Sequence, residues 1–165
     1  LSKHKGVHIL IQAFKGLKYK NVRLHIVGKG KDAEEFRKLA ENDSRIRFYG
    51  FVPEEELKKL YEMANIVVVP SIWYENSPVV IYESFMSGTP VIGSRIGGIP
   101  ELVRDGYNGH LFKAGNVDQL REVLESLILD DHALRKLELG ARRSIKEYDM
   151  NRHVKHLREI YNDLR

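Results

Sequence analysis

Cysteine is absent from the 165-residue sequence, which excludes disulfide bonds and any chemistry that depends on a thiol nucleophile. The absence is typical of intracellular proteins, so we expect a cytoplasmic location. No apolar run approaches the roughly 20 residues that a membrane-spanning helix needs. The first residues also lack the pattern of a signal peptide.

The basic residues do not form a single block either. The 27 lysines and arginines are interspersed with 23 acidic residues, and the formal net charge is only +4. This distribution argues against nucleic acid as a partner but allows an anionic small ligand. The seven histidines do not cluster with acidic residues at ligand spacing, so we expect no metal site. Walker loops and nucleophile-elbow motifs are absent, which leaves P-loop and serine-hydrolase functions without support.

Strand and helix patterns alternate along the chain. The expected strands are residues 22–27, 46–52, 66–69, 91–94 and 110–112. The alternation predicts an α/β fold, namely a Rossmann-like parallel sheet with helices on both faces. The length suits one well-cored domain, so we predict that residues 1–165 form a single domain. Because a helical pattern begins almost at Leu1, we interpret the sequence as a fragment of a longer protein.

Two glutamates stand close to the predicted start of a helix. The apolar run 66–69 predicts a buried strand, and the polar loop after it contains Glu75. Asn76-Ser77-Pro78 then predicts a capped helix start, and Glu83 falls in the second turn of an almost wholly apolar helix. A buried carboxylate requires a partner or a polar cleft. In open α/β sheets this is where ligands bind and where free amides favour phosphate.

Each glutamate by itself also fits a purely structural role. Glu75 then is a solvated loop residue, and Glu83 is an acid bonded to a lysine or a backbone amide. Their joint placement around one helix start favours a binding site instead. Carboxylate acceptors are well suited to holding vicinal hydroxyls, such as those of a ribose or a hexose.

A second motif points to a different function. Gly28-Lys29-Gly30, with Ala33 three residues later, matches the G-x-G-x-x-A dinucleotide fingerprint between a predicted strand and a predicted helix. Acids at 54–56 lie at about the distance expected for a ribose-binding residue, although they fall in a helix rather than at a strand end. The motif leaves open the nucleotide-binding module of an oxidoreductase.

Several ordered motifs together resemble one enzyme family. The segments that carry the resemblance are Lys5-Gly6, Ile26-Val27-Gly28-Lys29-Gly30, Phe48-Tyr49-Gly50-Phe51-Val52, Pro70-Ser71, Glu75 with seven residues before Glu83, Ser87-Gly88-Thr89-Pro90-Val91-Ile92, Gly97-Gly98-Ile99-Pro100-Glu101 and Asp105-Gly106-Tyr107-Asn108-Gly109-His110-Leu111-Phe112. In this order they are similar to the donor-binding, carboxy-terminal half of glycosyltransferase family four. That family is also called glycosyl transferases group one and consists of retaining enzymes of the GT-B fold.

The resemblance implies a role for each matching residue. Glu83 would accept hydrogen bonds from the ribose hydroxyls of a nucleoside diphosphate sugar, and Glu75 would hold hydroxyls of the transferred sugar. Lys5 would contact the diphosphate and stabilise the leaving nucleotide, so Lys5 and Glu75 are the expected catalytic residues. The other expected substrate-binding positions, at the helix start and around the base, are Asn76, Ser77, Val79, Val80, Gly28, Gly50, Phe51 and Val52.

For the longer parent, the resemblance implies transfer of a hexose such as mannose or glucose to a hydroxyl acceptor, with no metal or other cofactor. Asn76-Ser77-Pro78 replaces the family's glycine-rich loop, and the arginine that partners the lysine would precede Leu1. The amino-terminal domain is absent too, so we expect the chain to bind a donor without turnover. A nucleotide-sugar epimerase or a phosphorylase-like enzyme of the same fold is the alternative.

The expected partners are the nucleotide-sugar donor, the amino-terminal domain of the same protein and an acceptor at a membrane surface. The last helical pattern also carries an apolar stripe that another domain would normally cover, namely Val154, Leu157, Ile160, Tyr161 and Leu164. We expect this stripe to be partly uncovered, together with Trp73. Uncovered apolar patches tend to find partners, which predicts either a homo-oligomer through this helix or a mobile carboxyl terminus.

Overall fold

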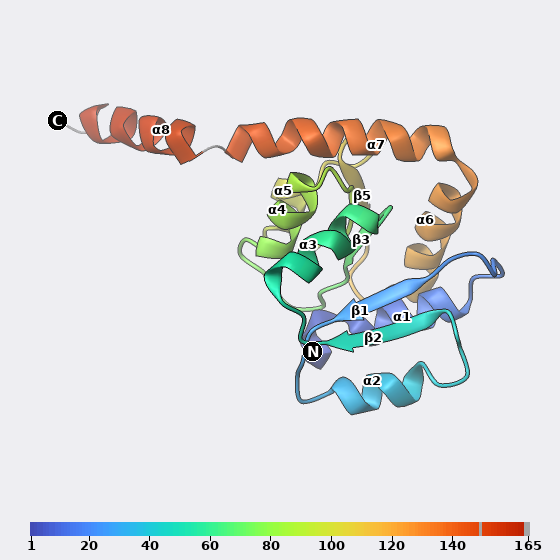
Figure 1. Cartoon of the computed structure of the whole chain (residues 1–165). Coiled ribbons are helices and arrows are strands. Elements are labelled where there is room, and N and C mark those ends of the chain that lie inside the picture. Colours follow the sequence, from blue (N-terminus) through green and yellow to red (C-terminus); the bar gives the residue numbers. More distant parts are fainter. Residues whose placement is uncertain (149, 164–165) are drawn as a thin grey trace.

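The computed structural model describes residues 1–148 and 150–163 and consists of helices alternating with short strands (Figure 1). The strands are β1 (Leu24–Val27), β2 (Ile46–Gly50), β3 (Val67–Val69), β4 (Val91–Ser94) and β5 (Gly109–Phe112). The α-helices are α1 (Val7–Lys15), α2 (Ala33–Leu39), α3 (Glu54–Met63), α4 (Val79–Met86), α5 (Ile99–Leu102), α6 (Val117–Leu129), α7 (Asp131–Ser144) and α8 (Met150–Asp163). Two 3₁₀ helices, η1 (Lys3–Lys5) and η2 (Ile145–Tyr148), complete the described chain.

The strand pairings confirm the predicted parallel α/β fold. β1 pairs in parallel with β2, and β4 pairs in parallel with both β3 and β5. The strands form two sheets, with orders β1-β2 and β3-β4-β5, where the sequence predicted one. All four residues of β4 are buried, whereas only Val69 of β3 is. The prediction of a β3 buried on both faces was therefore wrong, because within the described chain β4 is its one hydrogen-bonded neighbour.

Helix α1 connects the cores of the two sheets. Leu10 and Phe14 belong to the apolar cluster that contains β4 and α6 side chains, such as Ile92. Ile11 belongs to a second cluster that contains Ile26 of β1. A helix with apolar residues on more than one face is buried between its neighbours. The two sheets therefore share a core through α1.

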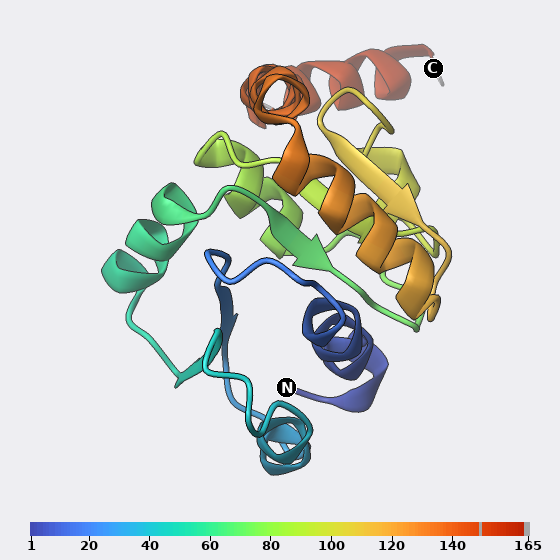
Figure 2. The ribbon, with the colours of Figure 1, turned by 90° about the vertical axis from the view of Figure 1, so that its right-hand side faces the viewer.

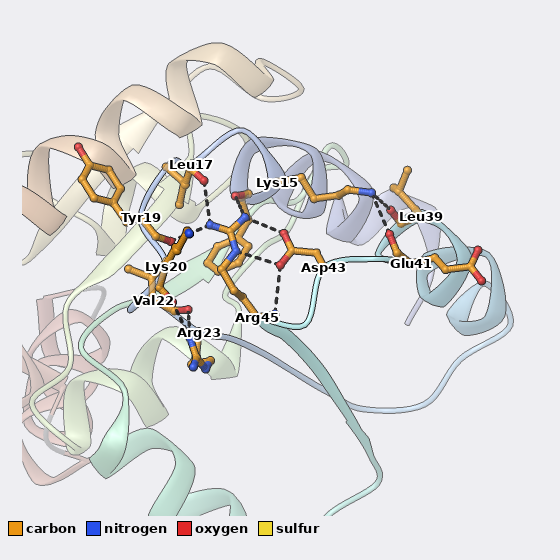
Figure 3. A network of polar contacts seen from close by, with 11 residues as sticks. Lys15, Leu17, Tyr19, Lys20, Val22, Arg23, Leu39, Glu41, Asp43 and Arg45 are labelled. Carbon is orange, nitrogen blue, oxygen red and sulfur yellow. Dashed lines mark hydrogen bonds and ion pairs between the residues drawn. The ribbon is translucent and has the colours of Figure 1, made fainter.

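A polar network closes this core at the carboxyl end of α1 (Figure 3). The guanidinium of Arg45 donates hydrogen bonds of 2.8 Å to the carbonyl oxygens of both Leu17 and Tyr19, and it pairs with Asp43 at 2.6 Å. The ammonium of Lys15 donates to the carbonyl oxygen of Leu39 at 2.8 Å. The network ties the end of α1 to the segment between α2 and β2. It satisfies carbonyls that would otherwise lack partners in a partly buried site.

The last helices form an arm along one side of the molecule. In Figure 1, α7 and α8 follow one another, and α8 projects beyond the rest of the chain. Four apolar residues of α8 are exposed, with exposed fractions of 39% for Val154, 40% for Leu157, 43% for Ile160 and 68% for Tyr161. The predicted uncovered stripe is confirmed for these four, and Leu164 lies outside the described residues. Among the helices that the structure describes, none has the length and apolar character to cross a membrane.

Candidate functional site

The loop between β3 and α4, residues 70–78, carries Glu75 and is held on two sides by backbone contacts. On one side, the backbone N–H of Ile72 donates to the carbonyl oxygen of His4 at 2.9 Å. On the other, the N–H of Gly98 donates to the carbonyl oxygen of Glu75 at 2.7 Å, and a side chain at Gly98 would overlap with the carbonyl oxygen of Asn76. The Gly97-Gly98 pair is therefore required for this close approach.

Two buried serines link this loop to the end of β4. The hydroxyl of Ser94 donates to the carbonyl oxygen of Ser71 at 2.6 Å. The hydroxyl of Ser71 in turn donates to Oε1 of Glu75 at 3.0 Å. Both serines are at most 2% exposed. The Glu75 carboxylate is thus positioned by the three-stranded sheet.

Lys5 is the last residue of η1, near the amino terminus, and its side chain contacts the same carboxylate. Its ammonium lies 2.6 Å from Oε1 of Glu75. The Glu75 side chain is 17% exposed, whereas that of Lys5 is 49% exposed. No described residue donates a hydrogen bond to Oε2 of Glu75, so that oxygen is available to a ligand. The two expected catalytic residues, 70 positions apart, are therefore in direct contact.

Glu83 obtains its partner from α3. The hydroxyl of Tyr61 donates a hydrogen bond of 2.8 Å to Oε2 of Glu83. Burial, and then the bond to Glu83, raise the pKa of Tyr61 well above the usual value, so the phenol is a stable donor. The expectation that Glu83 requires a partner is confirmed. The partner itself was not identified from the sequence.

The amino-terminal end of α4 is open. Pro78 occupies the N-cap position without any side-chain cap, so the predicted capping side chain is absent. Proline takes the position a capping residue would occupy, and the hydroxyl of Ser77 bonds the Tyr82 hydroxyl at 2.8 Å instead. The Val79 and Val80 side chains are 64% and 41% exposed, and their N–H groups have no acceptor within the described chain. A free helix amino terminus favours an anionic ligand.

The exposure of these valines shows that α4, although almost wholly apolar in sequence, is buried on one face only. Within this helix, the fully buried residues are Ile81, Ser84 and Phe85. Helical periodicity explains the difference, because positions 79 and 80 precede the face that packs on the sheet. Glu83 is partly buried at the border between the two faces.

The expected base-binding residues lie together at the carboxyl ends of β1 and β2. Gly28 has a φ of 116° and donates through its N–H to the carbonyl oxygen of Gly50 at 2.6 Å. Phe51 is 72% exposed, and the ammonium of Lys29 lies 5.7 Å from its ring centroid. Val52 is buried. Figure 1 shows the arrowheads of both strands at the same end of this sheet, near the start of the chain.

The dinucleotide fingerprint receives little support from this geometry. A side chain at Gly30 would overlap with the backbone of Leu1, so the turn is already filled. The carboxylate of Asp32 accepts a hydrogen bond from the N–H of Lys3 at 2.8 Å, and α2 contains only seven residues. The glycines therefore serve close packing of the chain and not the binding of a phosphate at α2.

Other parts of the described chain offer weaker candidates for a functional site. A surface hollow of about 430 Å³ is lined by Lys3, His8, Gln12, Glu35 and Leu39, none of which is a predicted site residue. Within the residues described, no group of three or more histidine or acidic side chains could hold a metal ion. The Glu75 and Glu83 region is thus the main candidate, and Figure 2 shows its elements, α4 and the β3-β4-β5 sheet, packed against each other.

Comparisons with known proteins indicate one enzyme family. The family model for glycosyl transferases group 1 matches residues 1–161. The chain is 32% identical over 174 aligned positions to D-inositol 3-phosphate glycosyltransferase from Corynebacterium glutamicum, covering 99% of this chain and 41% of that protein. It is 29% identical over 160 positions to phosphatidyl-myo-inositol mannosyltransferase from Mycobacterium leprae, covering 95% and 42%. The chain therefore spans less than half the length of these curated relatives.

Solved structures show the same relationship. The crystal structure of HepE from Anabaena in complex with UDP-glucose superposes with a TM-score of 0.87 at 26% identity, covering 99% of this chain and 46% of that chain. The carboxy-terminal domain of a glycosyl transferase group 1 protein from Francisella tularensis superposes with a TM-score of 0.80 at 26% identity, covering 91% and 83%. The predicted fold is confirmed, and the chain belongs to the glycosyl transferases group 1 family.

Proposed function

We propose that this chain is the donor-binding domain of a retaining glycosyltransferase that uses a nucleoside diphosphate hexose. The observation that carries the proposal is the arrangement around α4. The free amino terminus of α4 stands in the sequence between two residues with partnered carboxylates, Glu75 and Glu83. The ammonium of Lys5 contacts the first carboxylate. Such a site offers amides and a cation to a diphosphate and carboxylates to sugar hydroxyls.

Each residue has a specific role in this proposal. Glu83 accepts hydrogen bonds from the ribose hydroxyls, and Tyr61 fixes its carboxylate. Glu75 accepts hydrogen bonds from the hexose through its unpartnered oxygen. The free N–H groups of Val79 and Val80 bind the diphosphate together with Lys5.

The base lies in this proposal against the turns after β1 and β2. Gly28 and Gly50 bring the backbone of these turns together, and the exposed ring of Phe51 borders them. Stacking on an aromatic ring is a common way to hold a nucleobase without reading its identity. The crystal structure of HepE contains UDP-glucose, which makes this molecule the first donor to test.

Transfer itself belongs to the longer parent. Because the chain spans less than half of its curated relatives, we propose that a further domain binds the hydroxyl acceptor and completes the cleft. The exposed apolar residues of α8, among them Leu157 and Ile160, would be covered by that domain or by a second copy of the chain. The proposal requires no resident cofactor, and it places a membrane-surface acceptor among those to test with the parent.

Calorimetric titration of the chain with a panel of ligands tests the proposal. The panel contains UDP-glucose, GDP-mannose, ADP-glucose, NAD and NADP. We expect one nucleotide sugar to bind and to raise the melting temperature, because a ligand that binds only the folded state stabilises it. Glu83→Ala should weaken that binding, whereas the control Glu62→Ala, an exposed acid on α3, should leave it unchanged. Preferential binding of NAD or NADP would overturn the proposal in favour of an oxidoreductase module.

A further inference from the structure

The contact between Lys5 and Glu75 poses a problem for donor binding. The ammonium that would bind the diphosphate is already paired, at 2.6 Å, with the carboxylate that would bind the hexose. A carboxylate and a diphosphate are both anions, so they compete for the same cation. Donor binding must therefore rearrange this ion pair.

The two partners differ in how firmly they are held. Glu75 is largely buried, its Oε1 accepts from Ser71, and its carbonyl oxygen accepts from Gly98. The Lys5 side chain is about half exposed, and Glu75 is its one hydrogen-bond partner among the described residues. Lysine is a flexible stem with three donors on a point charge. Lys5 is therefore the partner that can move.

We propose that the Lys5–Glu75 ion pair acts as an exchange latch. An incoming diphosphate replaces Glu75 as the partner of Lys5, and the departure of Lys5 frees Oε1 of Glu75, still oriented by Ser71, for a sugar hydroxyl. This inference rests on the proposed function and adds a coupling between two of its subsites. No covalent step is involved, because only hydrogen bonds and an ion pair are exchanged.

The latch has a consequence for selectivity. A nucleotide sugar breaks the ion pair but supplies hydroxyls that give Glu75 new partners. A free nucleoside diphosphate breaks the same pair and leaves the carboxylate of Glu75 without them. The latch thus favours the intact donor over the nucleotide that remains after transfer. It assists release of that product, because Glu75 can recapture Lys5 once the hexose has gone.

A double-mutant cycle on the whole chain tests the exchange. The variants are Glu75→Gln, Lys5→Met and the double variant, each titrated calorimetrically with UDP, uridine and UDP-glucose at low salt. Glutamine keeps the shape and an acceptor for Ser71 but removes the charge that competes for Lys5. We expect Glu75→Gln to bind UDP roughly two- to five-fold tighter, which is the range of a partly exposed ion pair.

The other ligands and variants show whether this gain in UDP affinity comes from the exchange of the ion pair. Uridine should be unaffected because it has no diphosphate, and the gain in UDP affinity should vanish when Lys5 is already methionine. The preference for UDP-glucose over UDP should fall in Glu75→Gln. Ser71→Ala serves as a control, because it removes the other bond to Oε1 without removing charge, so the affinity for UDP should not rise.

Two results would overturn the latch. One is an unchanged or lower UDP affinity in Glu75→Gln, and the other is the same gain with and without Lys5, which would indicate general charge repulsion. If Glu75→Gln fails to fold, carbon-13 labelling of lysine in the unmodified chain supplies the test. The ε-methylene signal of Lys5, assigned with Lys5→Met, should move with UDP and not with uridine. Failure of the unmodified chain to bind any nucleotide sugar of the panel would instead overturn the proposed function. If the panel selects another base, its nucleoside, nucleoside diphosphate and nucleotide sugar replace uridine, UDP and UDP-glucose in this test.

Discussion

The hydroxyl of Tyr61 on α3 donates a hydrogen bond of 2.8 Å to the carboxylate of Glu83 on α4. The contact matters for both elements, because α3 contains no fully buried residue. The hydroxyl of Thr89 adds a second link by donating to the carbonyl oxygen of Tyr61 at 3.0 Å. Tyr61 therefore holds α3 beside the proposed ribose-binding residue.

Tyr61→Phe should destabilise the chain by about 1–2 kcal/mol, since a hydrogen bond to a charged acceptor is lost while the ring is kept. Chemical denaturation measures this change. The matched control is Tyr74→Phe, because Tyr74 is 77% exposed and its hydroxyl has no hydrogen-bond partner within the described residues. Equal stabilities of the two variants would show that the Tyr61 hydroxyl contributes nothing to the fold.

The same contact predicts a pH dependence at the alkaline end. Burial and the Glu83 carboxylate raise the pKa of Tyr61 in the folded state, so folding favours the neutral phenol. The contribution is complete below the unfolded-state pKa of about 10 and decreases as the pH rises above it. Between about pH 9 and pH 11, the unmodified chain should lose more stability than Tyr61→Phe. Parallel stability curves for the two proteins would contradict this assignment.

The two glutamates should have separable effects on binding. Glu83→Ala should weaken binding of both the free nucleotide and the nucleotide sugar by about 1.5–3 kcal/mol, because both ligands contain the ribose. Glu75→Ala should weaken the nucleotide sugar by a similar amount but not the free nucleotide. Calorimetric titration of each variant with UDP and UDP-glucose measures both effects. Equal losses for both ligands in both variants would rule out the division between ribose and hexose.

The sequence was sufficient to identify the two glutamates of the candidate site, but not the residues that hold them in place. Glu75 and Glu83 could be found because they interrupt a local pattern, a buried strand followed by an apolar helix. Tyr61 and Ser94 could not, because their roles come from contacts across 22 and 23 residues. A tyrosine on the apolar face of a helix is normally a core residue. The hydrogen bond of its hydroxyl can be predicted only when the helix packed opposite it, here α4, is known.

The fold was likewise predicted only in part. Alternating strands and helices indicated parallel pairing, which the registers of β1 with β2 and of β4 with its neighbours confirm. The division into two sheets was not foreseeable, because the alternation of strands and helices does not determine which strands pair. The Lys5–Glu75 contact was likewise missed, since the sequence suggested a separate ligand for each.

The Arg45 network should make a larger contribution to stability than an ordinary surface pair. Arg45→Lys keeps the charge, but a single ammonium cannot reproduce the fork that bonds Asp43, Leu17 and Tyr19. We expect a loss of about 2 kcal/mol in chemical denaturation, because partly buried acceptors lose their donors. Arg47→Lys, on the exposed side of β2, is the control and should change stability by less than about 0.5 kcal/mol.

Acid unfolding provides a second test of the Arg45–Asp43 contact in that network. The hydrogen bonds from Arg45 lower the pKa of Asp43, so folding favours the ionised carboxylate. Its contribution is present above the unfolded-state pKa of about 4 and is lost as the pH falls through the lower folded-state pKa. Below about pH 4, the unmodified chain should therefore lose more stability than Asp43→Asn. A larger acid-induced loss in Asp43→Asn would contradict the assignment.

Gly98 packs closely against the loop that carries Glu75. Gly98 has a φ of −81°, so alanine is allowed there by the backbone, and any effect must come from the overlap of its side chain with the carbonyl oxygen of Asn76. Gly98→Ala should destabilise the chain by about 1–3 kcal/mol, as overpacking typically does. It should also weaken binding of the nucleotide sugar, because the loop must shift and move the Glu75 carboxylate.

Gly16→Ala is the matched control for this substitution. Gly16 has a φ of −71°, and the side chain that it would meet is the flexible end of Arg121, which can move away. Alanine should be neutral there or stabilise the chain by up to about 1 kcal/mol, because it restricts the unfolded state. Denaturation and UDP-glucose titration of both variants separate a local packing effect from one on the site. A Gly98→Ala variant with unchanged stability and unchanged affinity would show that the glycine pair does not position Glu75.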